Sequence, residues 1–246
     1  MVSDLSIQGK HAVVTGGARG IGAGIAAALA ARGANVSIVS RSPGTGPFFS
    51  AVADVTDETQ IAQAFDAARA KHGPIAILVN NSGISESAPL SRTSTQLWDR
   101  IIATNLTGTF LCTRAAIGDM TASRWGRVLN VSSIAGLGGA AYISAYCASK
   151  HGVIGLTRAI AAEFAGTDIT ANAICPGYTD TAMMQQAMET IAKFTGATED
   201  AARSTLASMN PGGRIATVDE VAEAALGLIL SRRTGVSAIV PGGAEA

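Results

Sequence analysis

Short apolar stretches alternate with longer segments of helical periodicity along most of the chain. Short apolar stretches predict strands, and apolar residues three and four positions apart predict helices. The predicted strands are 11–15, 35–40, 50–53, 75–79, 127–131, 170–174 and 236–240. The predicted helices are 20–32, 57–71, 98–120, 146–164 and 217–230. Because strands and helices alternate in this way, we expect βαβ units and an α/β fold with a parallel sheet of about seven strands.

One stretch, from about 183 to 213, breaks this alternation and is rich in Met and Ala. We expect it to form a helical lid over the substrate site, or an inserted helical lobe. No linker divides the rest of the chain, so residues 1–246 are predicted to form a single domain. Thr217 and Glu220 have the spacing of a capping box, which predicts where the helix after this stretch begins.

Composition and charge narrow the class of protein. Of the 246 residues, 48% are hydrophobic and 15% are charged, a balance that excludes a natively unfolded chain. The 18 basic and 18 acidic residues cancel, so the basic excess of a nucleic-acid binder is absent from the sequence. We expect no membrane span and no secretory signal, because no apolar run is long enough. Cys112, Cys147 and Cys175 lie far apart, which predicts neither a disulfide framework nor a metal site and favours a reducing, cytoplasmic location.

A glycine-rich turn, TGGARGIG at 15–22, joins the first predicted strand to the first predicted helix. Glycines at 16, 20 and 22 let the backbone turn tightly and approach a pyrophosphate, which the positive end of the helix attracts. Glycine also serves ordinary turns, so the motif alone is weak evidence. Its place between strand and helix predicts a nucleotide site.

Tyr146 and Lys150 are four residues apart, so in a helix they share one face. Ser133 lies at the end of a predicted strand, where ligands bind in parallel α/β sheets. Its neighbour Ser132 has nearly the same context, and only the spacing to Tyr146 selects Ser133. A phenol, an ammonium and a hydroxyl near a nucleotide predict proton transfer to or from a substrate oxygen.

Six motifs occur in a fixed order: TGGARGIG at 15–22, NNSG at 80–83, NLTG at 105–108, NVSS at 130–133, YCASK at 146–150 and PGYTDT at 176–181. Together they resemble the short-chain dehydrogenase/reductase family over nearly the whole chain. The resemblance implies a Rossmann-like, doubly wound domain, a nicotinamide cofactor and hydride transfer at an alcohol or ketone. It also implies a catalytic tetrad of Asn105, Ser133, Tyr146 and Lys150.

Elementary chemistry suggests how these four side chains would divide the work. Tyr146 would give a proton to the ketone oxygen, but a free phenol has a pKa of about 10. The Lys150 charge could lower the phenol pKa by up to about three units, and Lys150 would also reach the cofactor ribose. Ser133 would hold the substrate oxygen. Asn105, within a predicted helix, would interrupt its hydrogen bonds and hold a water that resupplies the proton.

The resemblance also assigns cofactor contacts: Asp54 to the adenine, Asn81 beside the ribose and Thr181 to the carboxamide. The other expected cofactor contacts are Gly16, Arg19, Gly20, Ile21, Gly22, Ser40, Arg41, Val55, Gly83, Pro176, Gly177 and Thr179, besides Tyr146 and Lys150.

The end of the second predicted strand bears on the choice of cofactor. An NAD site favours a carboxylate there, whereas this chain has Ser40 followed by Arg41. Serine does not repel a 2′-phosphate and Arg41 can pair with one, so NADP(H) is favoured over NAD(H). Residues 42–49, rich in Pro and Gly, are predicted to form a loop, and such a loop could aim Arg41 into solvent.

The function predicted first is an NADP(H)-dependent ketone reductase or alcohol dehydrogenase. The alternative is a reductase of 3-oxoacyl thioesters on coenzyme A or acyl carrier protein; Arg124 and Arg127 are bases that could face an acidic carrier, while 163–169 offers two acids. A nucleotide-sensing protein without catalysis is a further class, which the intact tetrad disfavours.

We also expect a homo-oligomer, a tetramer with interfaces on helices 98–120 and 146–164 and on the last strand, and a small-molecule substrate. The candidate substrate residues are Ile84, Ile134, Ala140, Tyr178, Met183, Met184 and Met188. They are mostly apolar, which favours neutral ketones, although Met at helical spacing is more often core than pocket.

Overall fold

A seven-stranded, all-parallel sheet forms the centre of the computed structural model, which describes residues 5–44 and 46–240. The strands are β1 (His11–Thr15), β2 (Asn35–Ser40), β3 (Phe49–Val52), β4 (Ile75–Asn80), β5 (Trp125–Val131), β6 (Asp168–Pro176) and β7 (Ser237–Val240). Their order is β3-β2-β1-β4-β5-β6-β7. The order reverses at β1 and β4, so the sheet is doubly wound and Rossmann-like, as predicted.

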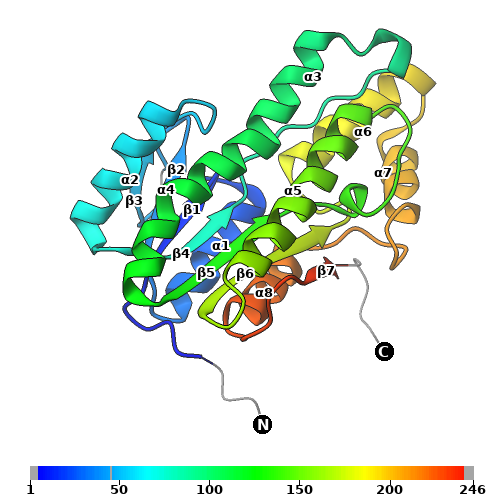
Figure 1. The fold of residues 1–246 in the computed structure, drawn as a ribbon. Helices are drawn as coiled ribbons and strands as arrows, with labels where there is room; N and C mark the ends of the chain where they lie inside the picture. Colours follow the sequence, from blue (N-terminus) through cyan, green and yellow to red (C-terminus); the bar gives the residue numbers. More distant parts are fainter. Residues whose placement is uncertain (1–4, 45, 241–246) are drawn as a thin grey trace.

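Helices cover both faces of this sheet (Figure 1). They are α1 (Gly20–Ala31), α2 (Glu58–His72), α3 (Thr95–Ile102), α4 (Gly108–Ser123), α5 (Ser144–Glu163), α6 (Ala182–Thr195), α7 (Glu199–Ser208) and α8 (Val218–Ile229). Alternate strand residues face opposite sides: Val14 packs in one core with α1 and α8, and Val13 packs in the other with α2, α4 and α5. The seven predicted strands are confirmed, and the central ones are buried, whereas Val52 on β3 and Ile239 on β7 are exposed at the two edges of the sheet.

The predicted helix over 98–120 is wrong as a single element. A π-helical turn at Ala103–Thr107 separates α3 from α4. A π turn adds a residue to the helical repeat and leaves local backbone groups out of the usual ladder. Asn105 lies inside it, so the expected interruption at this residue is confirmed.

Helices α6 and α7 occupy the stretch predicted to be a lid, and we call them the α6–α7 lobe. They bury a small cluster of their own, made by Met184, Met188, Ala202 and Leu206. The lobe returns to α8 through the predicted capping box, in which Thr217 and Glu220 exchange hydrogen bonds. No helix in the described part of the chain is long and apolar enough to cross a membrane.

Candidate functional site

The glycine-rich turn lies between β1 and α1, at the carboxyl edge of the sheet. Gly16 and Gly20 have φ values of +64° and +55°, a region that favours glycine. A Cβ on Gly22 would lie 2.4 Å from Nδ2 of Asn81, so a side chain there cannot fit. The Asn81 amide donates to the carbonyls of Thr15 and Gly16, at 3.0 and 3.1 Å. Asn81 therefore holds the turn itself, and its predicted place beside the ribose stays a prediction.

The start of α1 fits a pyrophosphate. Its N-cap residue Arg19 makes no side-chain cap hydrogen bond, and no acidic residue occupies the first turn. The N–H groups of this turn therefore keep their capacity for an anion. Thr181 lies over the same turn, because a Cβ on Gly20 would be 3.4 Å from its Cγ2. Residues 16–22 and 181, far apart in sequence, thus come together as expected.

Three of the predicted catalytic side chains meet at the ends of β4 and β5. Lys150 on α5 is buried and donates from Nζ to the Val131 carbonyl at 2.8 Å, with Nζ 5.6 Å from the centre of the Tyr146 ring. Ser133 accepts from the N–H of Ala135 at 3.1 Å, which leaves its own proton free to donate. Ser132 donates instead to the Lys150 carbonyl at 3.0 Å. The two neighbouring serines are therefore distinguished by their partners, and Ser133 faces Tyr146.

Asn105 completes this group from the π turn. A Cβ on Gly83 would lie 3.4 Å from Oδ1 of Asn105 and 3.6 Å from Nζ of Lys150, so Gly83 leaves open the space between them. Asn105 accepts from the N–H of Ile84 at 2.9 Å and donates to Ile84 O and to Ser149 Oγ, both at 3.0 Å. Both ends of its amide are thus bonded to protein atoms. The structure therefore gives the amide a positioning contact, and the water that it is expected to hold stays a prediction.

Burial controls the electrostatics of the site. Burial raises the pKa of Tyr146 to about 12, against a smaller lowering by the Ser133 hydroxyl. Burial also lowers the pKa of Lys150 to about 8. The expected lowering of the phenol pKa is thus wrong for the protein alone, because loss of hydration is the largest cause of the shift and raises this pKa. A low pKa for the lysine and a high one for the phenol both mark a site where charge is costly without a ligand.

The predicted adenine end lies at β2 and β3. Ser40 donates its hydroxyl to the carbonyl of Ser42 at 2.6 Å, and Arg41 is exposed. The Asp54 carboxylate accepts from the N–H and hydroxyl of Thr56, at 2.9 and 2.8 Å. Val55 is buried, and a Cβ on Gly108 would lie 2.8 Å from it. Residues 46–48, before β3, form no helix, as the composition predicts.

The predicted carboxamide segment follows β6, whose last residue, Pro176, is buried. Thr179 donates its hydroxyl to Gly177 O, and Thr181 donates to Thr179 O, both at 3.1 Å. Thr181 is also the N-cap residue of α6, without a side-chain cap bond. Ile21 lies half-buried in the first turn of α1, beside the glycines.

The predicted substrate residues divide into two groups. Ile84, Ile134 and Tyr178 are half-buried around the Asn105, Ser133 and Tyr146 side chains. Ala140 and Met183 are exposed, whereas Met184 and Met188 are buried in the α6–α7 lobe's own cluster. The last two side chains serve the packing of the lobe, which was the alternative left open for a Met stripe.

Sequence reasoning missed two polar residues of the site. Ser149 lies inside YCASK and donates its hydroxyl to Tyr146 O at 2.8 Å while accepting from Asn105. Asn210, far along the chain, binds the backbone beside Tyr178. Ser149 could have been found from its place between Tyr146 and Lys150, but no local signal marks Asn210.

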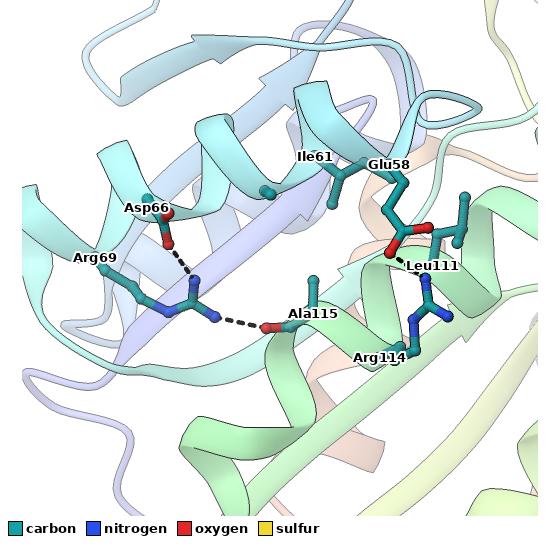
Figure 2. Close-up of a pocket in the computed structure, with 8 residues that line it drawn as sticks. Glu58, Ile61, Asp66, Arg69, Leu111, Arg114 and Ala115 are labelled. Atoms are coloured by element: carbon teal, nitrogen blue, oxygen red, sulfur yellow. Dashed lines mark hydrogen bonds and ion pairs between the residues drawn. The ribbon is translucent and has the colours of Figure 1, made fainter.

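A hollow lies away from this site, between α2 and α4 (Figure 2). It has a volume of about 310 Å³. Charged side chains line it in ion pairs, Arg114 with Glu58 and Arg69 with Asp66. Because its charges are already paired and none of the predicted site residues lines it, the hollow adds nothing to the site at the sheet edge.

Comparison with known proteins decides the family. The model of the short chain dehydrogenase family matches residues 10–192. This chain belongs to the short-chain dehydrogenase/reductase family. It is therefore an oxidoreductase that uses a nicotinamide cofactor and acts on hydroxyl or keto groups of small molecules.

Several relatives of this short-chain dehydrogenase/reductase are similar over most of their length. D-beta-hydroxybutyrate dehydrogenase of Cupriavidus necator is 39% identical over 239 residues, 92% of each chain. Cis-4-hydroxycyclohexanecarboxylate dehydrogenase of Sinomonas cyclohexanicum is 41% identical over 227 residues, 87% of each chain. Among solved structures, an actinorhodin polyketide ketoreductase with NADPH superposes with a TM-score of 0.90 at 30% identity, over 95% of this chain and 96% of the other.

Proposed function

We propose that this chain is an NADP(H)-dependent reductase of ketones and dehydrogenase of secondary alcohols, with Tyr146 as the general acid and base. The observation that supports the proposal is the convergence on Lys150: its Nζ lies near Asn105 around Gly83 and 5.6 Å from the centre of the Tyr146 ring, with Ser133 against the phenol. The glycine turn and the free start of α1 fit the pyrophosphate of a dinucleotide. The bound nicotinamide supplies or accepts a hydride at the substrate carbon.

The chain's own residues would handle the oxygen and its proton. The Ser133 hydroxyl accepts from the N–H of Ala135 and lies against the Tyr146 phenol, so it would donate its proton to the substrate oxygen and hold that oxygen close to Tyr146. Tyr146 carries its proton at every physiological pH in the protein alone, since burial raises its pKa to about 12. It is therefore ready to donate in the direction of reduction. Lys150 stabilises the phenolate left behind, because an ammonium close by favours the charged form.

Asn105 and Ser149 would act on this arrangement through position. The amide of Asn105 fixes Ile84, a predicted wall of the substrate site, through two backbone hydrogen bonds. Its third bond, to Ser149, ties the same loop to α5, where Ser149 in turn donates to the carbonyl of Tyr146. These hydrogen bonds link Ile84, at the predicted substrate site, to Tyr146, the proton donor, and so fix the distance between them.

The proposal is tested by a panel of carbonyl compounds, measured by loss of NADPH absorbance. The panel should contain neutral ketones, oxo acids and 3-oxoacyl thioesters, since relatives act on hydroxybutyrate and on a hydroxycyclohexanecarboxylate. We expect turnover of at least one ketone class. Cofactor binding without turnover of any class would contradict the proposal and favour a nucleotide-sensing protein.

The preference for NADP(H) is supported by Ser40 and Arg41. The Ser40 hydroxyl brings no negative charge to the end of β2, and the Arg41 side chain is exposed beside it. A charge-assisted contact with a 2′-phosphate predicts an NADPH preference of about ten- to a hundredfold in kcat/KM. The double substitution Ser40→Asp and Arg41→Ile should erase or reverse it. Equal kcat/KM for NADPH and NADH in the unmodified protein would show that Arg41 does not reach the phosphate.

The alternative function, reduction of 3-oxoacyl thioesters, is not supported by the positions of Arg124 and Arg127. Arg127 is buried at the amino end of β5 and cannot face an acidic carrier protein; its side chain is only 1% exposed. Arg124 is exposed but lies at the same end of the sheet, after α4. Neither arginine therefore borders the catalytic side chains, which lie at the carboxyl end of the sheet. The similarity to a polyketide ketoacyl reductase of Streptomyces violaceoruber, 37% over 225 residues, keeps thioesters in the panel.

A homotetramer remains a proposal. On α4, Phe110 is 43% exposed, an apolar side chain available for a second copy. Ile101, Val153 and Ile160, which lie within the two segments predicted to form helical interfaces, are buried in the chain's own core. Sedimentation at micromolar concentration should give a mass of about four chains, and a mass near the 24.8 kDa of one chain would contradict the proposal.

A further inference from the structure

Asn210 lies just after α7 and is a buried amide, 4% exposed, whose oxygen and nitrogen are both hydrogen-bonded to the backbone. Its Oδ1 accepts from the N–H of Tyr178 at 2.6 Å, and its Nδ2 donates to Tyr178 O at 2.9 Å and to Arg214 O at 2.7 Å. One side chain thus binds both backbone groups of a residue 32 positions away. A buried amide with three backbone hydrogen bonds holds its partners in one arrangement.

Gly177 shows that the chain is shaped around this side chain. A Cβ on Gly177 would lie 2.3 Å from Oδ1 and 2.7 Å from Cγ of Asn210. The glycine is required here because the amide occupies the space of its side chain. The sequence motif PGYTDT at 176–181 therefore has a partner within the chain, in addition to its predicted place beside the cofactor.

The contact between the two segments extends beyond one side chain. Ala216 donates its N–H to Tyr178 O and accepts from the N–H of Asp180, both at 3.0 Å, in a parallel bridge. Arg214 in turn pairs with Glu220, whose carboxylate caps α8. The entry to the α6–α7 lobe and the exit from it are therefore joined, and the exit is fixed to α8.

Tyr178 links the contact between these two segments to Tyr146, the proposed proton donor. Its side chain packs against the lobe cluster of Met184, Met188, Ala202 and Leu206. Its phenol is also close enough to Tyr146 for the charge of one to raise the pKa of the other. Tyr178 therefore lies between the lobe and the proton donor, and its backbone is held by Asn210.

We propose that Asn210 is a positioning residue for the reaction: by holding the backbone of Tyr178 it keeps that side chain between the α6–α7 lobe and Tyr146, so that closing the lobe on a substrate also aligns the substrate with Tyr146. This inference rests on the proposed function of the site. Tyr178 would line the substrate site, and the position of its side chain would depend on the position of the α6–α7 lobe. Loss of the amide should then weaken substrate binding more than it weakens cofactor binding or the fold.

The test compares Asn210→Ala with Asn172→Ala. Asn172 is a similarly buried amide on β6, 2% exposed, and it binds only the backbone of residues 233 and 236. Both substitutions should lower Tm. Only Asn210→Ala should raise the substrate KM, by about tenfold, the effect of losing roughly one net hydrogen bond. NADPH affinity, measured by fluorescence titration, should change less than the KM in both variants.

Asn210→Asp distinguishes the loss of the two N–H donors from the loss of side-chain volume. The carboxyl group has the volume of the amide and can still accept from the N–H of Tyr178, but its second oxygen faces the carbonyls of Tyr178 and Arg214 without a proton to donate. The KM of this variant should rise as in Asn210→Ala. A wild-type KM in both Asn210 variants, with Tm lowered as in Asn172→Ala, would reduce Asn210 to a structural residue and overturn the proposal.

Hydrogen exchange on the wild-type protein tests the coupling without any substrate. The N–H of Tyr178 should exchange together with those of α6 and α7, and more slowly when NADPH is bound. Exchange of Tyr178 together with β6, independent of the lobe, would overturn the proposal even if the Asn210 variants did not fold. If the wild-type protein turned over no carbonyl compound, the proposed function would fail, while this measurement would still decide whether Asn210 couples the lobe to Tyr178.

Discussion

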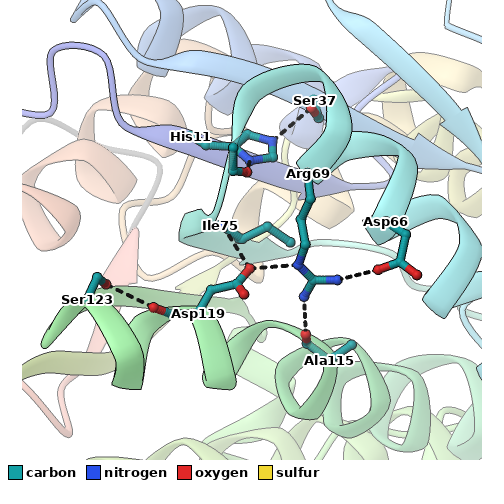
Figure 3. Close-up of polar contacts among 9 residues, drawn as sticks. His11, Ser37, Asp66, Arg69, Ile75, Ala115, Asp119 and Ser123 are labelled. Carbon is teal, nitrogen blue, oxygen red and sulfur yellow. Dashed lines mark hydrogen bonds and ion pairs between the residues drawn. The ribbon is translucent and has the colours of Figure 1, made fainter.

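The two ends of the sheet both carry buried and half-buried polar side chains, but these side chains have different hydrogen-bond partners. At the amino end, Figure 3 shows His11, Arg69 and Asp119 each bonded to neighbours from other elements. At the carboxyl end, Lys150, Tyr146 and Ser133 converge and keep part of their hydrogen-bonding capacity free. Burial alone therefore does not identify a catalytic group. A catalytic site is identified by polar side chains that converge and keep hydrogen-bond donors or acceptors available for a ligand.

The amino end is a bonded framework. His11 on β1 is bonded at both ring nitrogens, to Gly73 O at 2.7 Å and to Ser37 Oγ at 2.9 Å. Asp119 on α4 accepts from Arg69 Nε at 2.8 Å and from the N–H of Ile75 at 2.9 Å. These bonds join β1, β2, β4, α2 and α4, so they stabilise the fold.

Arg127, also at the amino end, is hydrogen-bonded to the protein backbone except at one of its nitrogens. Its guanidinium binds the carbonyls of Ile229, Gly126 and Asp168, at 3.0, 2.7 and 2.6 Å, and lies over the Trp125 ring at 4.4 Å. Its Nη2 has no hydrogen-bond partner among the described residues. Three carbonyls and an aromatic face still make it a structural cation, fixed between β5, β6 and α8.

The carboxyl end is less complete without its ligands. Among the described residues, the three-donor ammonium of Lys150 has one hydrogen bond, to Val131 O. Burial in this state lowers its pKa to about 8 and raises that of Tyr146 to about 12. Both shifts show a free-energy cost of burying charge that a bound dinucleotide and substrate would offset.

The largest effect is expected for Tyr146→Phe, which removes only the transferable proton. Turnover should fall by about 10²–10⁴, the usual contribution of general acid–base catalysis. Tm and NADPH affinity should stay close to those of the wild type, because the ring still packs. Substantial residual turnover, measured under saturating substrate, would contradict the role given to this phenol.

Lys150→Met should separate function from stability at the carboxyl end. We expect turnover to fall by about a hundredfold or more, with weaker NADPH binding, and Tm to stay equal or rise because a buried cation is removed. The folded-state pKa of about 8 lies below the ordinary 10.5 of lysine. The unfolded chain therefore holds more protons between these values, so wild-type stability should rise with pH there, and the rise should be absent in the variant. A clearly lower Tm would instead class Lys150 with the framework residues.

His11→Ala should give the opposite result at the amino end. It leaves Gly73 O and the Ser37 hydroxyl without partners, and should cost about 2–3 kcal/mol, roughly 5–10 °C in Tm. The kcat and KM should not change.

Acid pH tests the same histidine. Burial lowers the pKa of His11 below its ordinary 6.5, so the folded state keeps it neutral while the unfolded chain takes up a proton. Stability should therefore fall as the pH drops below about 6.5, by at most about 1.4 kcal/mol per pH unit. In His11→Ala this part of the Tm–pH curve should be flatter; an unchanged slope would assign the effect to other groups.

The smallest effect is expected for Asp119→Asn, which keeps an acceptor for the N–H of Ile75 but loses the charge that faces Arg69. Urea unfolding should show a loss of about 1 kcal/mol, because the pair is only partly shielded from solvent. Turnover should be unaffected. A loss of activity here would mean that the two ends of the sheet are coupled.

Local patterns in the sequence were enough for most of the architecture. The strand at 35–40 and the capping box of Thr217 and Glu220 were predicted with correct bounds, because apolar alternation and cap spacing act within a few residues. The glycine turn was recognised for the same reason, since its φ values and close approaches depend on residues within one loop and one neighbouring strand.

What the tertiary structure alone decided concerns burial and contacts between distant segments. No local pattern indicated that Arg127 would be buried, that burial would raise the pKa of Tyr146, or that Asn210 would bind Tyr178. Each of these depends on the free energy of a polar group in surroundings built by several elements. Sequence spacing brings such groups to the same edge of the sheet; only packing determines which of them keep water, which find a partner and which remain free for chemistry.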